Sequence, residues 1–266
     1  MIKSEQYFDA HCHLQDQRFE DQIDSIIEKS LLKKVAWMCS CGTSESDWDK
    51  LIALSNQFSC IIPVLGVHPW YIDSISEHWL ELLEQKTVEY RTIIGECGLD
   101  FVIKDVNKEK QIYVFEQQLL LAQKLEKTVC IHCRGAWQNL LQILDKVGEL
   151  PGSGLIHSYS GSADMVSELE KRGFYISFSG SLTNLNNKKI EKALKQVSYH
   201  RLLTETDSPD ITPYHLRGDS GDALNKPYNL PFIVEMIAKR TGITHAEIMQ
   251  NSYENAKTLF KSSING

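Results

Sequence analysis

The sequence predicts an α/β protein that folds as a single (β/α)8 barrel, the TIM-barrel fold, over residues 1–266. Eight short apolar segments alternate with helical patterns, which is the number of strands that a closed barrel needs. The chain has 266 residues with 42% hydrophobic content, enough for one barrel-sized core. Ionisable residues gather at the ends of the apolar segments, as they do in barrels that carry chemistry there.

The strand candidates are rich in Val, Ile, Leu, Cys and Phe, the composition of buried parallel strands. In chain order they are residues 6–10, 33–40, 60–67, 91–96, 128–132, 153–157, 173–179 and 200–205. Amphipathic helical patterns between them include residues 21–34, 111–126, 137–147 and 163–172. After the last strand we expect a polar loop at 208–229 and two helices, at 230–241 and 244–260. No repeat or Pro/Gly-rich linker divides the chain.

Composition narrows the class of protein. The N-terminal segment MIKSEQYFDA lacks an apolar leader, and no apolar run is long enough to span a bilayer. Seven cysteines are an odd number, which fits a reducing compartment and small buried side chains. We therefore expect a cytoplasmic protein that does not associate with a membrane and has no obligate protein partner. A net charge of −7 argues against a broad basic surface for duplex nucleic acid.

The stretch FDAHCHLQD places Asp9, His11 and His13 at alternate positions at the end of the first strand. Side chains two apart on a strand share one face, so these three groups are expected to converge. An H-x-H pair alone is more often a loop cap plus a core histidine than a pair of metal ligands. The other strand ends decide between these readings.

Ionisable side chains follow at least six of the predicted strands at the same end of the barrel. They are His11 and His13, then His68, Glu96, His132, His157 and Asp207. Singly, His68 could shape a turn, His157 could bond a carbonyl group, and Asp207 could cap the next segment. Chance would scatter such residues over both ends of the strands, so together they indicate a metal centre.

Imidazoles and carboxylates suit Zn, Mn or Co ions, or Mg if carboxylates and water dominate. The number of ligands exceeds what one tetrahedral ion needs, so we expect one or two divalent metal ions. Glu96 would bridge a pair of ions and lower the pKa of a shared water. Asp207 could bind one ion and accept the proton from that water, which makes Glu96 and Asp207 candidate catalytic residues.

The sequence resembles the TatD family of metal-dependent hydrolases over essentially its whole length. The motifs that carry the resemblance are FDAHCHL, GVHPW, IGECGLD, IHCR, IHSYSG, YISFSG, LLTETDSPD and the spaced residues Gln111, Phe115 and Gln118. The resemblance implies that His11, His13 and Asp207 hold one ion, that His132 and His157 hold the other, and that Glu96 bridges them. It also implies hydrolysis of phosphodiesters, with DNase activity in several members.

Neighbouring residues receive supporting roles. Asp9 and Glu205 are in phase with the ligands of their strands, so we expect them to orient imidazoles by hydrogen bonds. His68 is favoured as a catalytic or substrate-binding group over a turn-shaping residue. Arg134 could fork onto a phosphate or form a surface salt bridge. Trp70, Tyr71, Trp137 and Tyr159 could stack on bases or pack the rim.

One loop departs from the family pattern. Many members carry Arg-Asn-Glu-Pro after the eighth strand, whereas this chain has Leu224, Asn225, Lys226 and Pro227. We expect this loop to overhang the site, where Lys226 would either bind an anionic group of the substrate or remain a solvated lysine.

The leading interpretation is a divalent-metal-dependent phosphodiesterase or deoxyribonuclease that acts through a metal-bound hydroxide on single-stranded DNA or another phosphoester. The alternative keeps the fold and cleaves a C–N or carboxylic ester bond, as amidohydrolases do. Glu96 favours the first, because many amidohydrolases use a carbamylated lysine as the bridge at that position. A non-catalytic binding protein would be expected to lack a ligand, and none is missing from the sequence.

Overall fold

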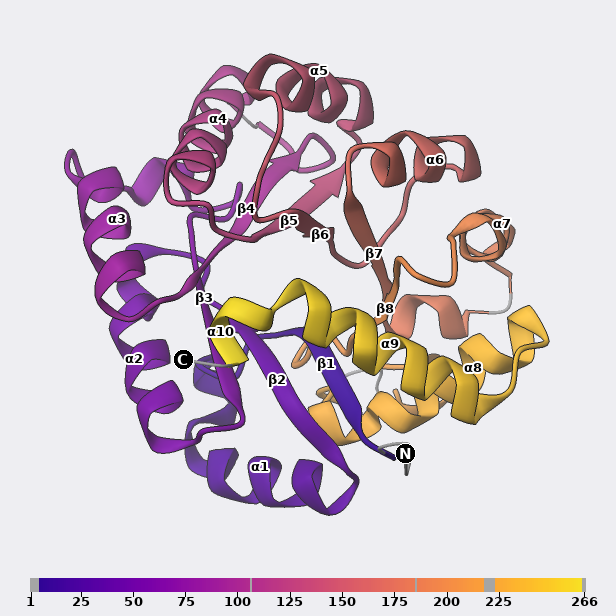
Figure 1. Ribbon diagram of the computed structural model, residues 1–266. Helices are drawn as coiled ribbons and strands as arrows, with labels where there is room; N and C mark the ends of the chain where they lie inside the picture. The colour runs from indigo at the N-terminus through magenta and orange to yellow at the C-terminus, as the bar shows by residue number, and fades with distance from the viewer. Residues whose placement is uncertain (1–4, 106, 185, 218–222, 265–266) are drawn as a thin grey trace.

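The computed structural model describes residues 5–105, 107–184, 186–217 and 223–264. Residues 1–4, 106, 185, 265 and 266 of the predicted domain, and residues 218–222 of the predicted loop, lie outside this part. Within it, parallel strands form one sheet in the order β1 to β8 (Figure 1). They are β1 Tyr7–Cys12, β2 Val35–Cys41, β3 Ile61–Leu65, β4 Ile93–Asp100, β5 Val129–Arg134, β6 Gly154–Ile156, β7 Phe174–Phe178 and β8 Leu202–Thr204. The predicted barrel fold is confirmed.

Helices surround the strands (Figure 1); most connect one strand to the next, and the last three of those described follow β8. They are α1 Ile23–Leu32, α2 Glu45–Gln57, α3 Trp79–Glu89, α4 Lys108–Lys124, α5 Trp137–Val147, α6 Ala163–Lys171, α7 Lys188–Gln196, α8 Leu230–Thr241, α9 His245–Leu259 and α10 Lys261–Ile264. Serine, threonine and asparagine begin several of them, for example Thr244 in a capping box with Glu247 at the start of α9. The loop predicted at 208–229 contains two short 3-10 turns, Tyr214–Leu216 and Pro227–Asn229.

Backbone hydrogen bonds just beyond β8 close the barrel against β1. The N–H of Asp207 donates to the carbonyl oxygen of His11 at 2.9 Å, and the N–H of His13 donates to that of Ser208 at 2.7 Å. The first and last strands therefore present their polar ends side by side.

The hydrophobic core has an outer and an inner part. The outer part lies between the strands and the surrounding helices. The inner part fills the barrel with inward side chains of the strands, including Phe8, Ile62 and Leu155. Tyr253 of α9 and Phe260, the residue that follows this helix, add to it. Helix α9 lies across one end of the barrel (Figure 1), so chemistry is left to the opposite end, where the strands terminate.

Two glutamines of α4 explain the Gln111–Gln118 segment of the family motif. The Gln118 amide accepts from the N–H of Val67 at 2.8 Å and donates to its carbonyl oxygen at 3.1 Å. The Gln111 amide accepts from the N–H of Asp100 at 2.9 Å and donates to the carbonyl oxygen of Pro69 at 3.1 Å. These bonds satisfy buried backbone groups and fix the chain after β3 and β4.

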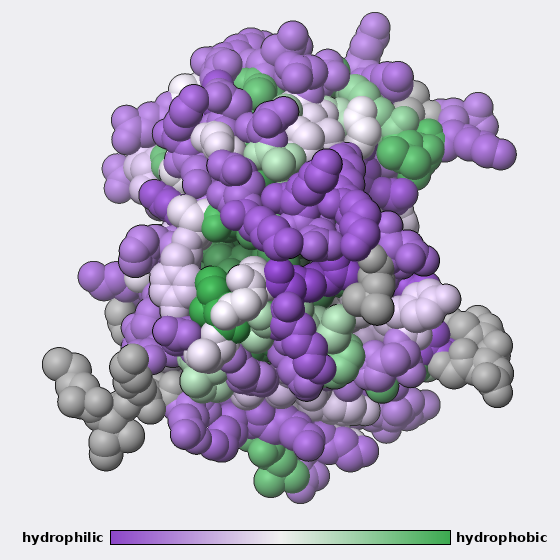
Figure 2. Space-filling model, turned by 90° about the vertical axis from the view of Figure 1, so that its right-hand side faces the viewer, coloured by the Kyte–Doolittle hydropathy of each residue, from purple (hydrophilic) through white to green (hydrophobic). Residues whose placement is uncertain are grey.

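The face of the molecule in Figure 2 is mostly hydrophilic, with hydrophobic residues confined to small patches and a central hollow. Among the described helices, none combines the length and the apolar character required to cross a bilayer.

Candidate metal centre

The predicted ligands converge at the open end of the barrel, in a cleft of about 1040 Å³. Its lining includes His13, His68, Glu96, His132, His157 and Asp207. His11 lies just beneath the lining and is fully buried. The sequence-based expectation that these side chains share one end of the barrel therefore agrees with their placement.

Glu96 lies at the centre of the cluster, and its two oxygens face different imidazoles. Oε1 lies 2.7 Å from Nε2 of His157, 3.0 Å from Nδ1 of His132 and 3.3 Å from Nε2 of His68. Oε2 lies 3.3 Å from Nε2 of His11 and 3.6 Å from Nε2 of His13. A carboxylate placed between two sets of imidazoles has the geometry of a bridging ligand.

Asp207 completes the second set of donor atoms. Its Oδ1 lies 3.5 Å from Nε2 of His13 and 3.7 Å from Nε2 of His11. The donor atoms of His11, His13 and Asp207 all lie within 4.8 Å of one another. The same holds for His68, Glu96 and His132.

Hydrogen bonds fix the tautomers of two histidines. Nδ1 of His13 lies 2.7 Å from the carbonyl oxygen of Cys41, which can only accept, so Nδ1 carries the proton. Nε2 of His132 lies 3.3 Å from the carboxylate of Asp100 and donates to it. The lone pairs of His13 Nε2 and His132 Nδ1 therefore face the centre, as metal coordination requires. The residues present fit a divalent cation by this chemistry.

His68 has the opposite arrangement. Its Nδ1 accepts a hydrogen bond from the N–H of Trp70 at 3.2 Å, so in the neutral ring the hydrogen lies on Nε2. Burial lowers the pKa of His68 to about 4, against the opposing effect of Glu96. His68 therefore presents an N–H donor to the cleft and stays neutral near pH 7.

The buried cluster brings carboxylates and imidazoles together, so each group shifts the pKa of its neighbours. Burial raises the pKa of Asp207, but hydrogen bonding to His13 and the other imidazoles lower it to about 2. The imidazoles likewise outweigh burial and hold the pKa of Glu96 well below its usual range. Burial and His11 lower the pKa of His157, yet Glu96 and Glu205 raise it to about 10. Both carboxylates are ionised and available to a cation.

Asp9 differs from the expectation that it orients an imidazole. Its carboxylate accepts from the N–H of Thr206 at 2.8 Å and from the Thr206 hydroxyl at 2.6 Å. The pairing register of β1 shifts between Asp9 and Cys12, which breaks the simple alternation that the sequence suggested. Asp9 therefore joins β1 to the segment after β8.

Glu205 lies beside the imidazole of His157, but at a distance longer than the hydrogen bond that was expected. Its Oε1 is 3.6 Å from Nδ1 of His157 and accepts from the N–H of Ser158 at 2.6 Å. The hydroxyl of Ser177 donates to Oε2. Glu205 is thus held in place behind His157.

Asp100 is a residue that the sequence reasoning missed. Its Oδ2 accepts from His132, from Nε1 of Trp70 at 2.9 Å and from Nη1 of Arg134 at 3.2 Å. It stands four residues after Glu96 on β4, so the period of a strand could have signalled it. Gly98 between them lets β4 approach β5, because a Cβ there would lie 1.9 Å from the His132 carbonyl oxygen.

The predicted substrate-binding residues separate into two groups. His68 and Arg134 line the cleft, and the side chain of Arg134 is 45% exposed. Lys226 is absent from the residues that line the cleft within the described part of the chain. Its ammonium group donates to the carbonyl oxygen of Leu224 at 3.0 Å, because the loop turns it back on itself. The loop itself reaches the cleft through Asp210 and Ile211, while the placement of Lys226 favours the second of its two expected roles, a lysine without a substrate contact.

The aromatic residues also divide. Trp70 and Tyr71 line the cleft and are 52% and 42% exposed. Tyr159 is buried and packs against Trp137, so it belongs to the wall rather than to a stacking surface.

A parallel eight-stranded barrel with converging imidazoles and carboxylates at its open end defines the class: a TIM-barrel metal-dependent hydrolase. Comparison with known proteins narrows this class to a family. Residues 8–261 match the family model of TatD related DNases. The chain is 31% identical to the uncharacterized metal-dependent hydrolase YabD of Bacillus subtilis, over 96% of this chain and 98% of YabD. The chain therefore belongs to the TatD family of metal-dependent hydrolases.

Two further similarities bear on this family. The 3'-5' ssDNA/RNA exonuclease TatD of Shigella flexneri is 28% identical, over 95% of this chain and 98% of that protein. The crystal structure of YjjV, a TatD homolog from Escherichia coli K12, matches with a TM-score of 0.90 at 25% identity, over 96% of this chain and 98% of that chain.

Proposed function

We propose that this protein hydrolyses phosphodiester bonds of single-stranded nucleic acid with one or two divalent metal ions. The observation that carries the proposal is the placement of Glu96, whose two oxygens face separate sets of imidazoles. His11, His13 and Asp207 would hold one ion, and His132 and His157 the other. A divalent cation bound there supplies Lewis-acid stabilisation of phosphoryl oxygens and activates water.

The protein's own groups have distinct tasks in this proposal. Asp207, ionised and at the edge of the cluster, accepts the proton of the attacking water. The N–H of His68 donates to a phosphoryl oxygen and stabilises the negative charge that develops there. Arg134 contacts a neighbouring phosphate through the part of its guanidinium group that Asp100 leaves free.

The cleft also suits an unpaired strand. Trp70 and Tyr71 present exposed rings at its rim, and aromatic rings stack on bases of any sequence. A duplex would need a wider cationic surface than a chain of net charge −7 provides. The Shigella relative, named as an exonuclease of single-stranded DNA and RNA, supports the same substrate class.

The test is hydrolysis by protein that is first stripped with a chelator and then loaded with Mg, Mn, Co or Zn. Labelled single-stranded DNA, RNA and a small phosphodiester should be cleaved only after loading. Glu96→Gln should abolish turnover, whereas Glu254→Gln, an exposed position on α9, should leave it unchanged. If the protein cleaves an amide or a carboxylic ester and no phosphodiester with any of these metals, the proposal is wrong and the amidohydrolase-like alternative is supported.

A further inference from the structure

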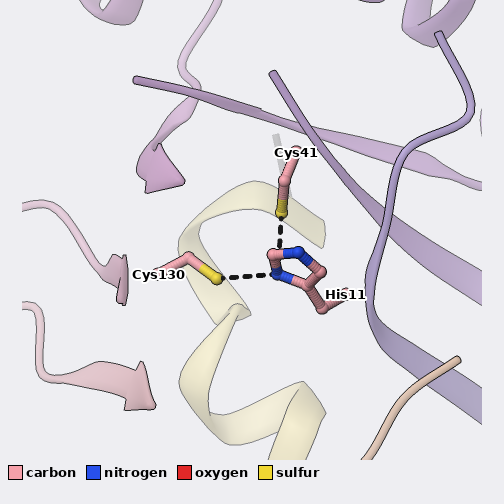
Figure 3. Close-up of side chains that lie close together, drawn as sticks. All are labelled: His11, Cys41 and Cys130. Atoms are coloured by element: carbon pink, nitrogen blue, oxygen red, sulfur yellow. Dashed lines mark hydrogen bonds between the residues drawn. The ribbon is translucent and has the colours of Figure 1, made fainter. Parts of the chain in front are cut away.

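Two thiols contact His11 on the side that faces away from the cleft. The sulfur of Cys130, on β5, lies 3.1 Å from Nδ1 of His11, and the sulfur of Cys41, on β2, lies 3.3 Å from the same atom. Figure 3 shows both sulfur atoms directed at the imidazole ring. Three strands thus bring one nitrogen and two sulfurs to one point inside the barrel.

The geometry of this group suits a small cation. The three donor atoms all lie within 4.8 Å of one another. Both cysteines are free thiols, and His11, Cys41 and Cys130 have exposed fractions of 0%, 0% and 1%. An ion at their centre would be withdrawn from water and surrounded by polarizable sulfur, which is the environment that thiophilic metals prefer.

The group is separate from the candidate hydrolytic centre, although it shares a ligand with it. Nε2 of His11 points to Glu96 at 3.3 Å, while Nδ1 points to the thiols. The imidazole ring therefore divides a harder donor set, rich in carboxylate and imidazole, from a softer one. Since the two nitrogens belong to one ring, an ion on one side changes the electron density available on the other.

We propose that Cys41, Cys130 and Nδ1 of His11 form a second metal site, selective for a soft, thiophilic cation such as Zn²⁺, Cd²⁺ or Cu⁺. Binding replaces the two thiol protons, which leave to solvent, by two metal–sulfur bonds. A neutral imidazole has a single ring lone pair, so an ion on Nδ1 leaves Nε2 carrying hydrogen. An ion in the thiol site thereby prevents Nε2 of His11 from binding an ion in the hydrolytic centre.

Cadmium titration of the chelator-stripped native chain tests the site directly. Cd²⁺ should produce a thiolate-to-metal charge-transfer absorption band. The intensity of this band should saturate when one ion per chain has bound to the thiols. Cys41→Ser and Cys130→Ser should each abolish most of the band. Cys39→Ser is the matched control, because Cys39 is equally buried in the inner core on the same strand as Cys41, and it should keep the band.

A native protein without the band, or a band that survives in both Cys41→Ser and Cys130→Ser, would overturn the proposal. Anomalous diffraction from cadmium-soaked native crystals provides a second readout that does not depend on how the variants fold. The ion should lie between the two sulfurs and Nδ1 of His11, and cadmium found only in the cleft or at other cysteines would refute the site. Both readouts detect the metal itself, so neither depends on whether the protein cleaves phosphodiesters.

Discussion

The carboxylate of Asp100 accepts a hydrogen bond from Nε2 of His132, 3.3 Å away, and the same oxygen accepts from Trp70 and Arg134. Burial raises the pKa of Asp100, but the hydrogen bonds from His132 and Trp70 hold it well below its usual range. One acid therefore links the orientation of a proposed metal ligand to two residues on the substrate side of the cleft.

Asp100→Asn should weaken metal binding or turnover by about 10- to 100-fold, the usual cost of losing a partner that orients a ligand. The amide cannot accept three hydrogen bonds and carries no charge to oppose that of Arg134. Metal titration and steady-state kinetics measure the two effects. Asp73→Asn is the control, because the side chain of Asp73 is 80% exposed and pairs only with Lys110 among the ion pairs described. Unchanged metal affinity and turnover would show that Asp100 has no such role.

Asp207→Asn keeps the size of the side chain and one oxygen that can bind metal. Turnover should fall by on the order of 10² or more, because the charge and basicity needed to accept a proton are lost. Metal content should fall only partly, and substrate affinity should change little. Metal analysis and kinetics on the same sample test this, and a variant with full metal and most of its kcat would remove Asp207 from the proposed mechanism.

His68 should make the stability of metal-free protein depend on pH. Its pKa is about 4 in the folded chain, below the ordinary value of 6.5, so the unfolded chain binds more protons between these values. The contribution of His68 to the free energy of unfolding is complete above pH about 6.5 and is lost as the pH falls to about 4. Denaturant unfolding should show that the free energy of unfolding falls less for His68→Gln than for the native chain over this pH range. Equal losses would contradict the lowered pKa.

Gln118→Ala should destabilise the fold, because it removes the partners of both backbone groups of buried Val67. Each unsatisfied group costs about 1–3 kcal/mol. Equilibrium unfolding measures the loss. Gln196→Ala, at an exposed position that bonds only the Ser167 hydroxyl among the contacts described, should change stability little. A loss no larger than that of the control would mean that water or a rearranged loop replaces the Gln118 amide.

Salt should reduce binding of single-stranded DNA only modestly. Among the cations that line the cleft, Arg18 bonds two acids, Asp16 and Asp210, at 2.7 and 2.9 Å. The partners of the other two are weaker, because Lys50 lies 4.0 Å from Glu20 and Arg134 bonds Asp100 through one nitrogen only. Lys50 and Arg134 could neutralise about two phosphates, for which the slope of log affinity against log salt is about −1.4. Binding measured between low and high salt tests this value. A much steeper slope would reveal a cationic surface outside the cleft.

Local pattern was sufficient to predict the strands and their polar ends. Apolar runs such as residues 128–132 identify buried strands, and barrel topology then brings His132, Glu96 and Asp207 together. The proposal that Glu96 bridges two ions rests on the number of ligands and on the family resemblance, and the imidazoles that face both of its oxygens support it.

Other features depend on contacts between distant segments and could not be predicted this way. The phase of Asp100 on β4 is visible in the sequence, but its hydrogen bonds with His132 on β5 and with Trp70 in the loop after β3 are not. The inward phase of Cys130 was visible in the sequence, but its approach to Cys41 across the barrel was not. Of the two roles expected for Lys226, the bond of its ammonium group to Leu224 favours the one without a substrate contact, because the course of the loop decides where that group lies.

The hydrogen bonds between β1 and the segment after β8 join two parts of the chain that the ribosome makes far apart in time. Asp9 and Thr206, which bond directly, are 197 residues apart, and Asp207 follows them into the cluster. A nascent chain that has not yet released its eighth strand from the ribosome holds every imidazole of the centre but lacks the carboxylate that completes the set around His11 and His13. The set around His11 and His13 is therefore complete only in a chain whose eighth strand has joined β1.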